Sequence, residues 1–197
     1  MQTGSTAFEI GQSIRYGWQT IKKDFWYFVG IAFIVIVFEG IFNSDTDRHG
    51  WGLLSFLVSA WLTPGYLKLL LSYHDGNKLP IVEIFKQYRY FWRVLGATII
   101  LGLGTVIGLV LFIVPGIYFA LTFAFTLHCI VDKDLGIIDA MKKSAELTRG
   151  VKLSLFGFGL TSLGIIILGA LCFGVGVFVA APVVWLGVIF IYRKLAG

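Results

Sequence analysis

Hydrophobic residues in this chain form long uninterrupted blocks. The longest, Leu153 to Tyr192, contains forty residues without a charged side chain or a histidine. A helix of that length would measure about 60 Å, roughly twice the hydrocarbon thickness of a bilayer, so the block predicts a hairpin that crosses a membrane twice. A second block, Val94 to Val131, holds 38 residues with no charged residue and His128 as its only histidine. The same reasoning predicts another hairpin there.

Six spans account for the apolar blocks most economically. They are Phe25 to Phe42, Trp51 to Leu71, Val94 to Val114, Ile117 to Val131, Leu153 to Leu171, and Val177 to Tyr192. A turn at Pro115 and Gly116 divides the 38-residue block, because proline cannot continue a helix and suits a first helical turn. Cys172 to Gly176 is the expected turn of the last hairpin; Pro182 is a competing position, and we favour a kink there.

The composition agrees with a single integral membrane domain over residues 1–197. The chain is 57% hydrophobic and 14% charged, whereas soluble domains carry about 25% charged residues. Its net charge of +5 comes from segments that flank the spans, so we expect no nucleic-acid partner. No cleaved signal peptide is expected, since no short apolar core with a small-residue cleavage site precedes Phe25. The predicted fold class is all-α and polytopic.

Lysine and arginine positions predict the orientation in the membrane. With a cytoplasmic N-terminus, only Arg48 of the 16 basic residues lies on the outer side, and an even number of spans returns the C-terminus to the cytoplasm. The expected location is therefore a bacterial cytoplasmic (inner) membrane, with both termini inside.

An internal repeat precedes two of the predicted hairpins. Residues 8–18, FEIGQSIRYGW, and residues 82–92, VEIFKQYRYFW, are identical at five of eleven positions. Ile10, Ile14, Trp18 and Ile21 would share one helical face, as would Ile81, Phe85, Tyr88 and Trp92. A third helix is expected over Leu135 to Arg149, with Asp134 as N-cap and Gly150 beyond its end. The predicted architecture is three units, each a cytoplasmic amphipathic helix followed by a hairpin. The alternative is that these segments are the cytoplasmic ends of long tilted spans.

Each repeat contains an arginine three residues before a tryptophan, Arg15 with Trp18 and Arg89 with Trp92. Residues three apart share a helical face, so an indole can lie at the acyl boundary while the guanidinium contacts a lipid phosphate. We therefore expect these four residues to bind lipid headgroups.

No catalytic constellation is present in the sequence. It lacks the nucleophile, metalloprotease, phosphate-loop and paired-cysteine motifs, so we expect no enzyme activity, no cofactor and no metal. Cys129 and Cys172 lie near opposite membrane faces in the predicted topology, which excludes a disulfide between them.

Three polar side chains fall inside or near predicted spans. Glu39, Lys68 and His128 are candidate intramembrane polar residues, because such groups often mark a transport path. Lys68 can instead extend to the interface, and His128 can be a packed or interfacial histidine. Gly104 and Gly108 lie on one face of the third span, where small residues let a neighbouring helix approach closely.

The C-terminal 40% of the chain carries several characteristic motifs: VPGIYFAL, DAMKKSAELTRGVKLSLFGFGL and PVVWLGVIFIYRKL. These segments resemble an uncharacterised family of bacterial integral membrane proteins, which is similar to the membrane domain of glycerophosphodiester phosphodiesterases. The resemblance implies a membrane fold. It does not imply catalysis, since the soluble phosphodiesterase part is absent from these residues.

The expected function is that of a non-enzymatic membrane module that interacts with lipids or organises other membrane components. Membrane lipids are the expected partners; other membrane proteins or further copies of the chain remain open. The alternative is a small transporter or channel that uses Glu39, either as a monomer or as an oligomer.

Overall fold

The computed structural model describes residues 8–43, 51–171 and 176–197, and every element within them is helical. The elements are α1 (Ile10–Lys23), α2 (Phe25–Asn43), α3 (Trp51–His74), α4 (Phe91–Leu111), α5 (Ile113–Thr122), α6 (Thr126–Lys133), α7 (Ile137–Leu147), α8 (Lys152–Leu171) and α9 (Val177–Ala196), with two short 3-10 helices, η1 (Ile81–Lys86) and η2 (Tyr88–Tyr90). The predicted all-α class is therefore confirmed.

Several of these helices can cross a membrane. Among the described residues, five helical segments have the length and hydropathy of a span: Leu54–His74, Ile81–Leu111, Ile113–Lys133, Lys152–Leu171 and Val177–Ala196. The described apolar part of α2, Phe25–Phe38, is shorter. Only 11% of the most apolar window of Ile81–Leu111, and 17% of that of Lys152–Leu171, is buried inside the protein. Exposed apolar surface this large indicates a membrane protein, because its exposure to water would be energetically unfavourable.

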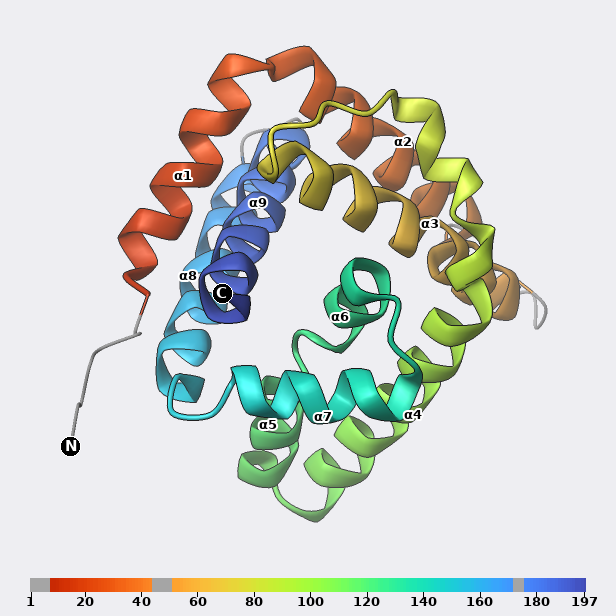
Figure 1. The fold of residues 1–197 in the computed structure, drawn as a ribbon, viewed down its shortest axis with the longest axis vertical. Helices are drawn as coiled ribbons and strands as arrows, with labels where there is room; N and C mark the ends of the chain where they lie inside the picture. Colours follow the sequence, from red (N-terminus) through yellow and green to blue (C-terminus); the bar gives the residue numbers. More distant parts are fainter. Residues whose placement is uncertain (1–7, 44–50, 172–175) are drawn as a thin grey trace.

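Helix α1 is separate from α2 and packs across the α8–α9 pair. Asp24 interrupts the helix between them, with φ −133° and ψ 53°. Phe8 meets Phe158 of α8 edge to face at 6.4 Å, and Gly17 lies against the backbone of Val183 in α9. Figure 1 shows α1 along the outer edge of the molecule beside α8 and α9. It is therefore not a straight extension of the α2 span.

The second copy of the repeat does not form the predicted helix. Residues 81–90 form η1 and η2 instead, with Gln87 between them outside helical geometry. The backbone of Ile84 packs directly against Gly65 in α3, in a space that any side chain at Gly65 would fill. This close approach holds η1 against α3, whereas the first copy of the repeat packs as an α-helix against α9.

Helices α4 and α5 form an apolar hairpin that projects from the rest of the fold at the bottom of Figure 1. Its turn is at Phe112, which has extended backbone angles, three residues before the predicted Pro115. Pro115 lies instead in the first turn of α5, where its missing N–H has no cost. The hairpin is tight: a Cβ on Gly108 would lie 2.8 Å from the Cα of Gly116, and one on Gly104 would collide with the ring of Phe119.

The fourth predicted span is broken into α5 and α6 at Phe123–Phe125, and α7 packs against the break. The hydroxyl of Ser144 donates to the carbonyl of Thr122 at 3.0 Å and accepts from the N–H of Phe125 at 3.1 Å. Thr148 also donates to the Thr122 carbonyl, at 3.0 Å. Both hydroxyl residues are fully buried. The third predicted amphipathic helix therefore satisfies the backbone groups that the break leaves unpaired.

The start of α7 and the packing of α5 also differ from prediction. Asp134 has a left-handed backbone and is not the N-cap; Gly136 precedes the first residue of α7. Gly150 does lie beyond the helix end with φ +84°.

The ring of Tyr118 in α5 contacts the ammonium group of Lys152, the first residue of α8. If the spans simply alternated in direction, the start of α5 and the start of α8 would lie on opposite sides of the membrane. The arrangement of hairpins in the membrane thus stays a prediction. The turn near Gly174 lies outside the described residues.

Candidate functional site: ion pairs at one end of the bundle

The charged side chains of five chain segments meet at one end of the bundle, called here the polar end. These segments are the α1–α2 junction, the end of α3 with the loop after it, the start of α4, the end of α6 and the end of α9. The predicted topology puts all five segments on the cytoplasmic side of the membrane, and their contacts show that they share one end of the protein.

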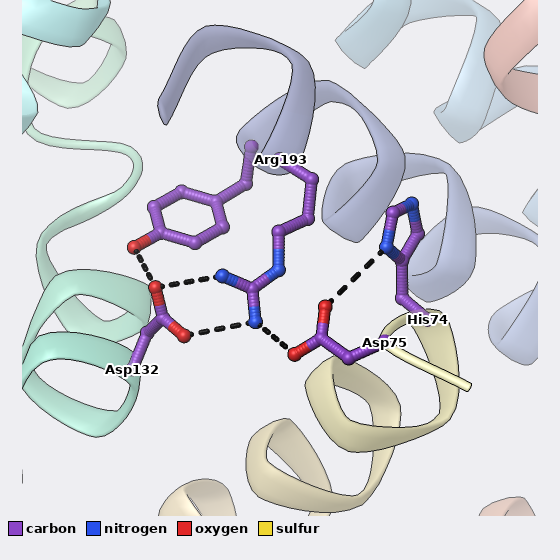
Figure 2. Close-up of polar contacts among 5 residues, drawn as sticks. His74, Asp75, Asp132 and Arg193 are labelled. Carbon is purple, nitrogen blue, oxygen red and sulfur yellow. Dashed lines mark hydrogen bonds and ion pairs between the residues drawn. The ribbon is translucent and has the colours of Figure 1, made fainter. Parts of the chain in front are cut away.

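Arg193 is the centre of the largest group, the Arg193 cluster, with Asp75, Asp132, Tyr192 and His74. Its guanidinium contacts both carboxylate oxygens of Asp132 at 2.9 Å, and Nη2 also donates to Asp75 (Figure 2). The Tyr192 hydroxyl donates to Asp132 at 2.7 Å, while His74 Nδ1 lies 3.7 Å from Asp75. A two-point contact of this kind is among the strongest that a carboxylate forms. The cluster joins α3, α6 and α9.

The Arg193 cluster carries more negative than positive charge. Two carboxylates face one guanidinium, so its net charge is −1 when His74 is neutral. The Asp132 side chain is only 12% exposed, and Nε of Arg193 is buried without a partner among the described residues. Asp75 is 44% exposed, so the cluster opens to its surroundings on that side.

Asp24 holds a second group together. It accepts hydrogen bonds from Lys78 and from the Tyr73 hydroxyl, the latter at 2.7 Å. Lys78, followed by Tyr73, lowers the pKa of the Asp24 carboxyl below its usual value. The Tyr27 hydroxyl donates to the carbonyl of Leu79 at 2.7 Å. These contacts attach the loop after α3 to the first turn of α2.

Asp134 pairs with two arginines, Arg89 of η2 and Arg93 in the first turn of α4. All three side chains are about half exposed. The predicted headgroup residue Arg89 therefore shares its charge with a carboxylate of the protein. Its neighbour Trp92 is 75% exposed and points outward.

The other predicted headgroup residues lie on the outer face of α1. Arg15 is exposed, and Trp18 is 47% exposed with the Lys22 ammonium 5.1 Å from its ring centroid. The opposite face of α1, which includes Ser13, Gly17 and Ile21, is buried. The indole and the guanidinium are thus available to a partner outside the chain.

Two of the three candidate intramembrane residues, His128 and Lys68, have described side chains, and no hydrogen bond or ion pair joins these two. His128 is buried in α6 between the rings of Phe125 and Tyr192, and its Nδ1 has no partner in that part of the chain. Lys68 is half-buried in α3. Glu39 belongs to α2, and its side chain lies outside the described residues.

Ion pairs dominate the contacts at the polar end. Its carboxylates Asp24, Asp132 and Asp134 each accept from a cation of the protein, and no group of three or more metal-binding side chains occurs in the described ranges. The arrangement suits structural ion pairing and contact with external anions.

Sequence reasoning missed Asp24, Asp75 and Asp132 as site residues. A usable signal existed: each lies directly at the end of a helix, and each of these helix ends falls on the same predicted side of the membrane. What the sequence did not contain was the choice of partner, since Arg193 could have paired with any of the nearby carboxylates.

The chain is similar to proteins from mycobacteria that have no established function. It is 26% identical to uncharacterized protein Rv2560 of Mycobacterium tuberculosis over 235 aligned positions, which cover 98% of this chain and 70% of that protein. The same values hold for uncharacterized protein Mb2590 of Mycobacterium bovis. No protein-family model matches the chain, and no solved structure matches it. These comparisons lend no support to the resemblance to the phosphodiesterase membrane domain.

Proposed function

We propose that this protein is a non-enzymatic membrane module whose polar end contacts the headgroups of anionic phospholipids. The observation that carries the proposal is a set of exposed indoles beside cations. Trp18, Trp26 and Trp92 are 47%, 82% and 75% exposed. Tryptophan concentrates at the membrane interface, where its ring contacts the acyl boundary and its N–H stays among polar groups.

Two of the three tryptophans lie close in the chain to ion-paired residues of the polar end, and the third lies beside cations of α1. Trp26 follows Asp24 by two residues, and Trp92 precedes Arg93 by one. Trp18 shares the outer surface of α1 with Arg15 and Lys22. Cations near a bilayer attract anionic lipids by about 1 kcal/mol each. The indoles and the cations therefore favour the same location, the headgroup layer on the cytoplasmic side of an inner membrane.

The exposed apolar faces support the same proposal. The α4–α5 hairpin and α8 carry large exposed side chains such as Val110, at 81%, and Leu153, at 84%. In a membrane these faces meet lipid chains or the spans of other proteins. The transporter alternative depends on Glu39, whose side chain lies outside the described residues, and it stays a prediction.

Native mass spectrometry tests the proposal after the protein is reconstituted in equal amounts of phosphatidylglycerol and phosphatidylcholine with identical chains. We expect phosphatidylglycerol to be enriched among the lipids that remain bound. The double substitution Arg15→Gln with Arg89→Gln should reduce this enrichment. A matched control, Arg15→Lys with Arg89→Lys, keeps both charges and should leave it largely intact. Equal retention of both lipids by the unsubstituted protein would refute the proposal.

A further inference from the structure

A basic hollow lies between the end of α7 and the end of α9, called here the α7–α9 hollow. Its volume is about 290 Å³. Lys143 of α7, Arg149 of the α7–α8 turn and Lys194 of α9 line it together with one carboxylate, Glu146. Leu147, Val151 and Leu195 form its apolar wall. Cations from three separate elements thus converge on one small space.

The charge of this hollow is not balanced by the protein. Lys143 donates to Glu146 at 3.0 Å, which neutralises both. For Arg149 and Lys194, no carboxylate lies within 4.0 Å in the described part of the chain. Three cations against one carboxylate leave a net charge of +2. An anion in the hollow would meet two free cationic side chains.

The backbone around Arg149 is held in place without any ligand. Thr148, the preceding residue, is fully buried, and its hydroxyl donates to the Thr122 carbonyl. Gly150, the following residue, has φ +84°, a conformation that glycine adopts readily. Val151, which is buried, donates its N–H to the Thr148 carbonyl at 3.3 Å, so the turn is held on both sides of Arg149 and binding an anion requires little ordering of the backbone.

The residues that directly follow the hollow along the chain line an apolar groove. Val151 belongs to the hollow, and the next residues, Lys152 and Leu153, line a groove of about 310 Å³ between α5 and α8. Tyr118, Leu121 and Phe156 complete most of its surface, and Lys152 is its only charged residue. The Lys152 ammonium lies 3.5 Å from the ring centroid of Tyr118, so it is held at one side of the groove.

We propose that the α7–α9 hollow binds the phosphate of an anionic phospholipid, one acyl chain of which follows α8 into the α5–α8 groove. The adjoining apolar groove favours a membrane lipid over free phosphate, since a soluble ion would leave that surface unused. Arg149 and Lys194 contact the phosphate, and Leu153 and Phe156 contact the chain. This inference rests on the proposed function and gives it a specific site, apart from Arg15 and Arg89.

The competition test uses the same reconstituted protein and lipid mixture. Arg149→Gln with Lys194→Gln should lower the ratio of bound phosphatidylglycerol to phosphatidylcholine by about tenfold or more, because each cation near the surface contributes roughly a factor of five. The control Lys86→Gln, at an exposed cation outside the hollow that already pairs with Glu83 at 2.7 Å, should change it less than twofold. Inorganic phosphate and glycerol phosphate, added at constant ionic strength, should not displace the lipid, because they lack the acyl chain.

The outcomes separate this inference from the proposed function. If the unsubstituted protein prefers phosphatidylglycerol but the Arg149 and Lys194 substitutions act no more strongly than the Lys86→Gln control, the hollow is not the site and the general proposal survives. Displacement by inorganic phosphate would show a soluble anion site and overturn the lipid assignment. Absence of any preference in the unsubstituted protein would overturn both. Arg149→Lys with Lys194→Arg keeps the charges and should retain most of the preference.

Discussion

At the scale of single residues, the positive charge of the Arg193 guanidinium allows the carboxylates of Asp75 and Asp132 to lie close together. Asp75 and Asp132 both contact it, and Asp132 is largely shielded. Without the arginine, each carboxylate would repel the other and Asp132 would lose its two-point contact. Removing one partner of a shielded ion pair costs more than the pair itself contributes.

We therefore predict that Arg193→Gln lowers the free energy of unfolding by about 2 kcal/mol. Adding Asp75→Asn should restore part of this loss, because it removes one of the two unpaired carboxylates. Thermal unfolding in detergent measures both effects. Lys194→Gln serves as the neighbouring control, since that side chain is exposed. If Arg193→Gln and Lys194→Gln are equally mild, the cluster does not stabilise the fold.

The lowered pKa of Asp24 predicts how the stability of the fold depends on pH. Its pKa in the folded protein lies below the usual value of 3.8, so its contribution to stability is complete above that value. The contribution disappears as the pH falls through the lowered pKa. Asp24→Asn should thus lower the melting temperature at pH 6 and make it fall less steeply between pH 4 and the acid limit of the assay. Asp139→Asn, at an exposed carboxyl, is the control; identical slopes in both variants would contradict the assignment.

At the scale of elements, α7 supplies hydrogen bonds to the backbone at the break between α5 and α6. Ser144 accepts from the Phe125 N–H and donates to the Thr122 carbonyl. Ser144→Ala leaves the buried Phe125 N–H without its partner, which should cost about 1–3 kcal/mol, while the Thr122 carbonyl keeps its bond from Thr148. Thr161→Ala is a suitable control, because the Thr161 hydroxyl is exposed and bonds only within its own helix among the described contacts. Equal melting temperatures for the two variants would mean that water already reaches the break.

The α4–α5 hairpin depends on two glycines and offers its own control. Gly104→Leu with Gly108→Leu should separate the two helices and lower the melting temperature in detergent by several degrees, because both glycines face α5 at contact distance. Gly102→Leu should have little effect, since a Cβ there meets nothing within 4 Å. If all three glycines tolerate leucine equally, α5 does not pack closely on α4.

The sequence predicted element positions well where hydrophobic block length alone decides them. The predicted spans Phe25 to Phe42, Trp51 to Leu71 and Leu153 to Leu171 begin and end within three residues of α2, α3 and α8. It did not predict η1 or the break at Phe123–Phe125. Both depend on contacts distant in sequence, namely Ile84 with Gly65 and Ser144 with Thr122. Local periodicity contains no information about such contacts.

The sequence likewise predicted some features of the candidate site and not others. Arg15, Trp18 and Trp92 were predicted from their spacing, and the structure leaves them exposed, although their contact with lipid stays a prediction. The pairing of Arg89 with Asp134 was not predicted, because Asp134 lies 45 residues away. The sequence shows which residues are charged, but it does not show which of them form an ion pair in the folded protein.

At the scale of the whole molecule, the account depends on which side of the membrane the polar end faces. Five segments meet at that end, and the asymmetry of lysine and arginine predicts that it faces the cytoplasm. Lys142 is exposed on α7 near this end, whereas Ser144, two residues later, is buried and unsuitable for labelling. Thr46, in the predicted outer loop, lies outside the described residues.

Cysteine labelling in sealed membrane vesicles tests this orientation most directly. Lys142→Cys and Thr46→Cys are made separately in a protein whose Cys129 and Cys172 have been replaced by alanine, and each is treated with a maleimide that cannot cross the membrane. The account predicts that Thr46→Cys reacts in right-side-out vesicles and Lys142→Cys only in inside-out vesicles. Reaction of both variants from the same side would contradict the six-span arrangement with the polar end at the cytoplasmic headgroups.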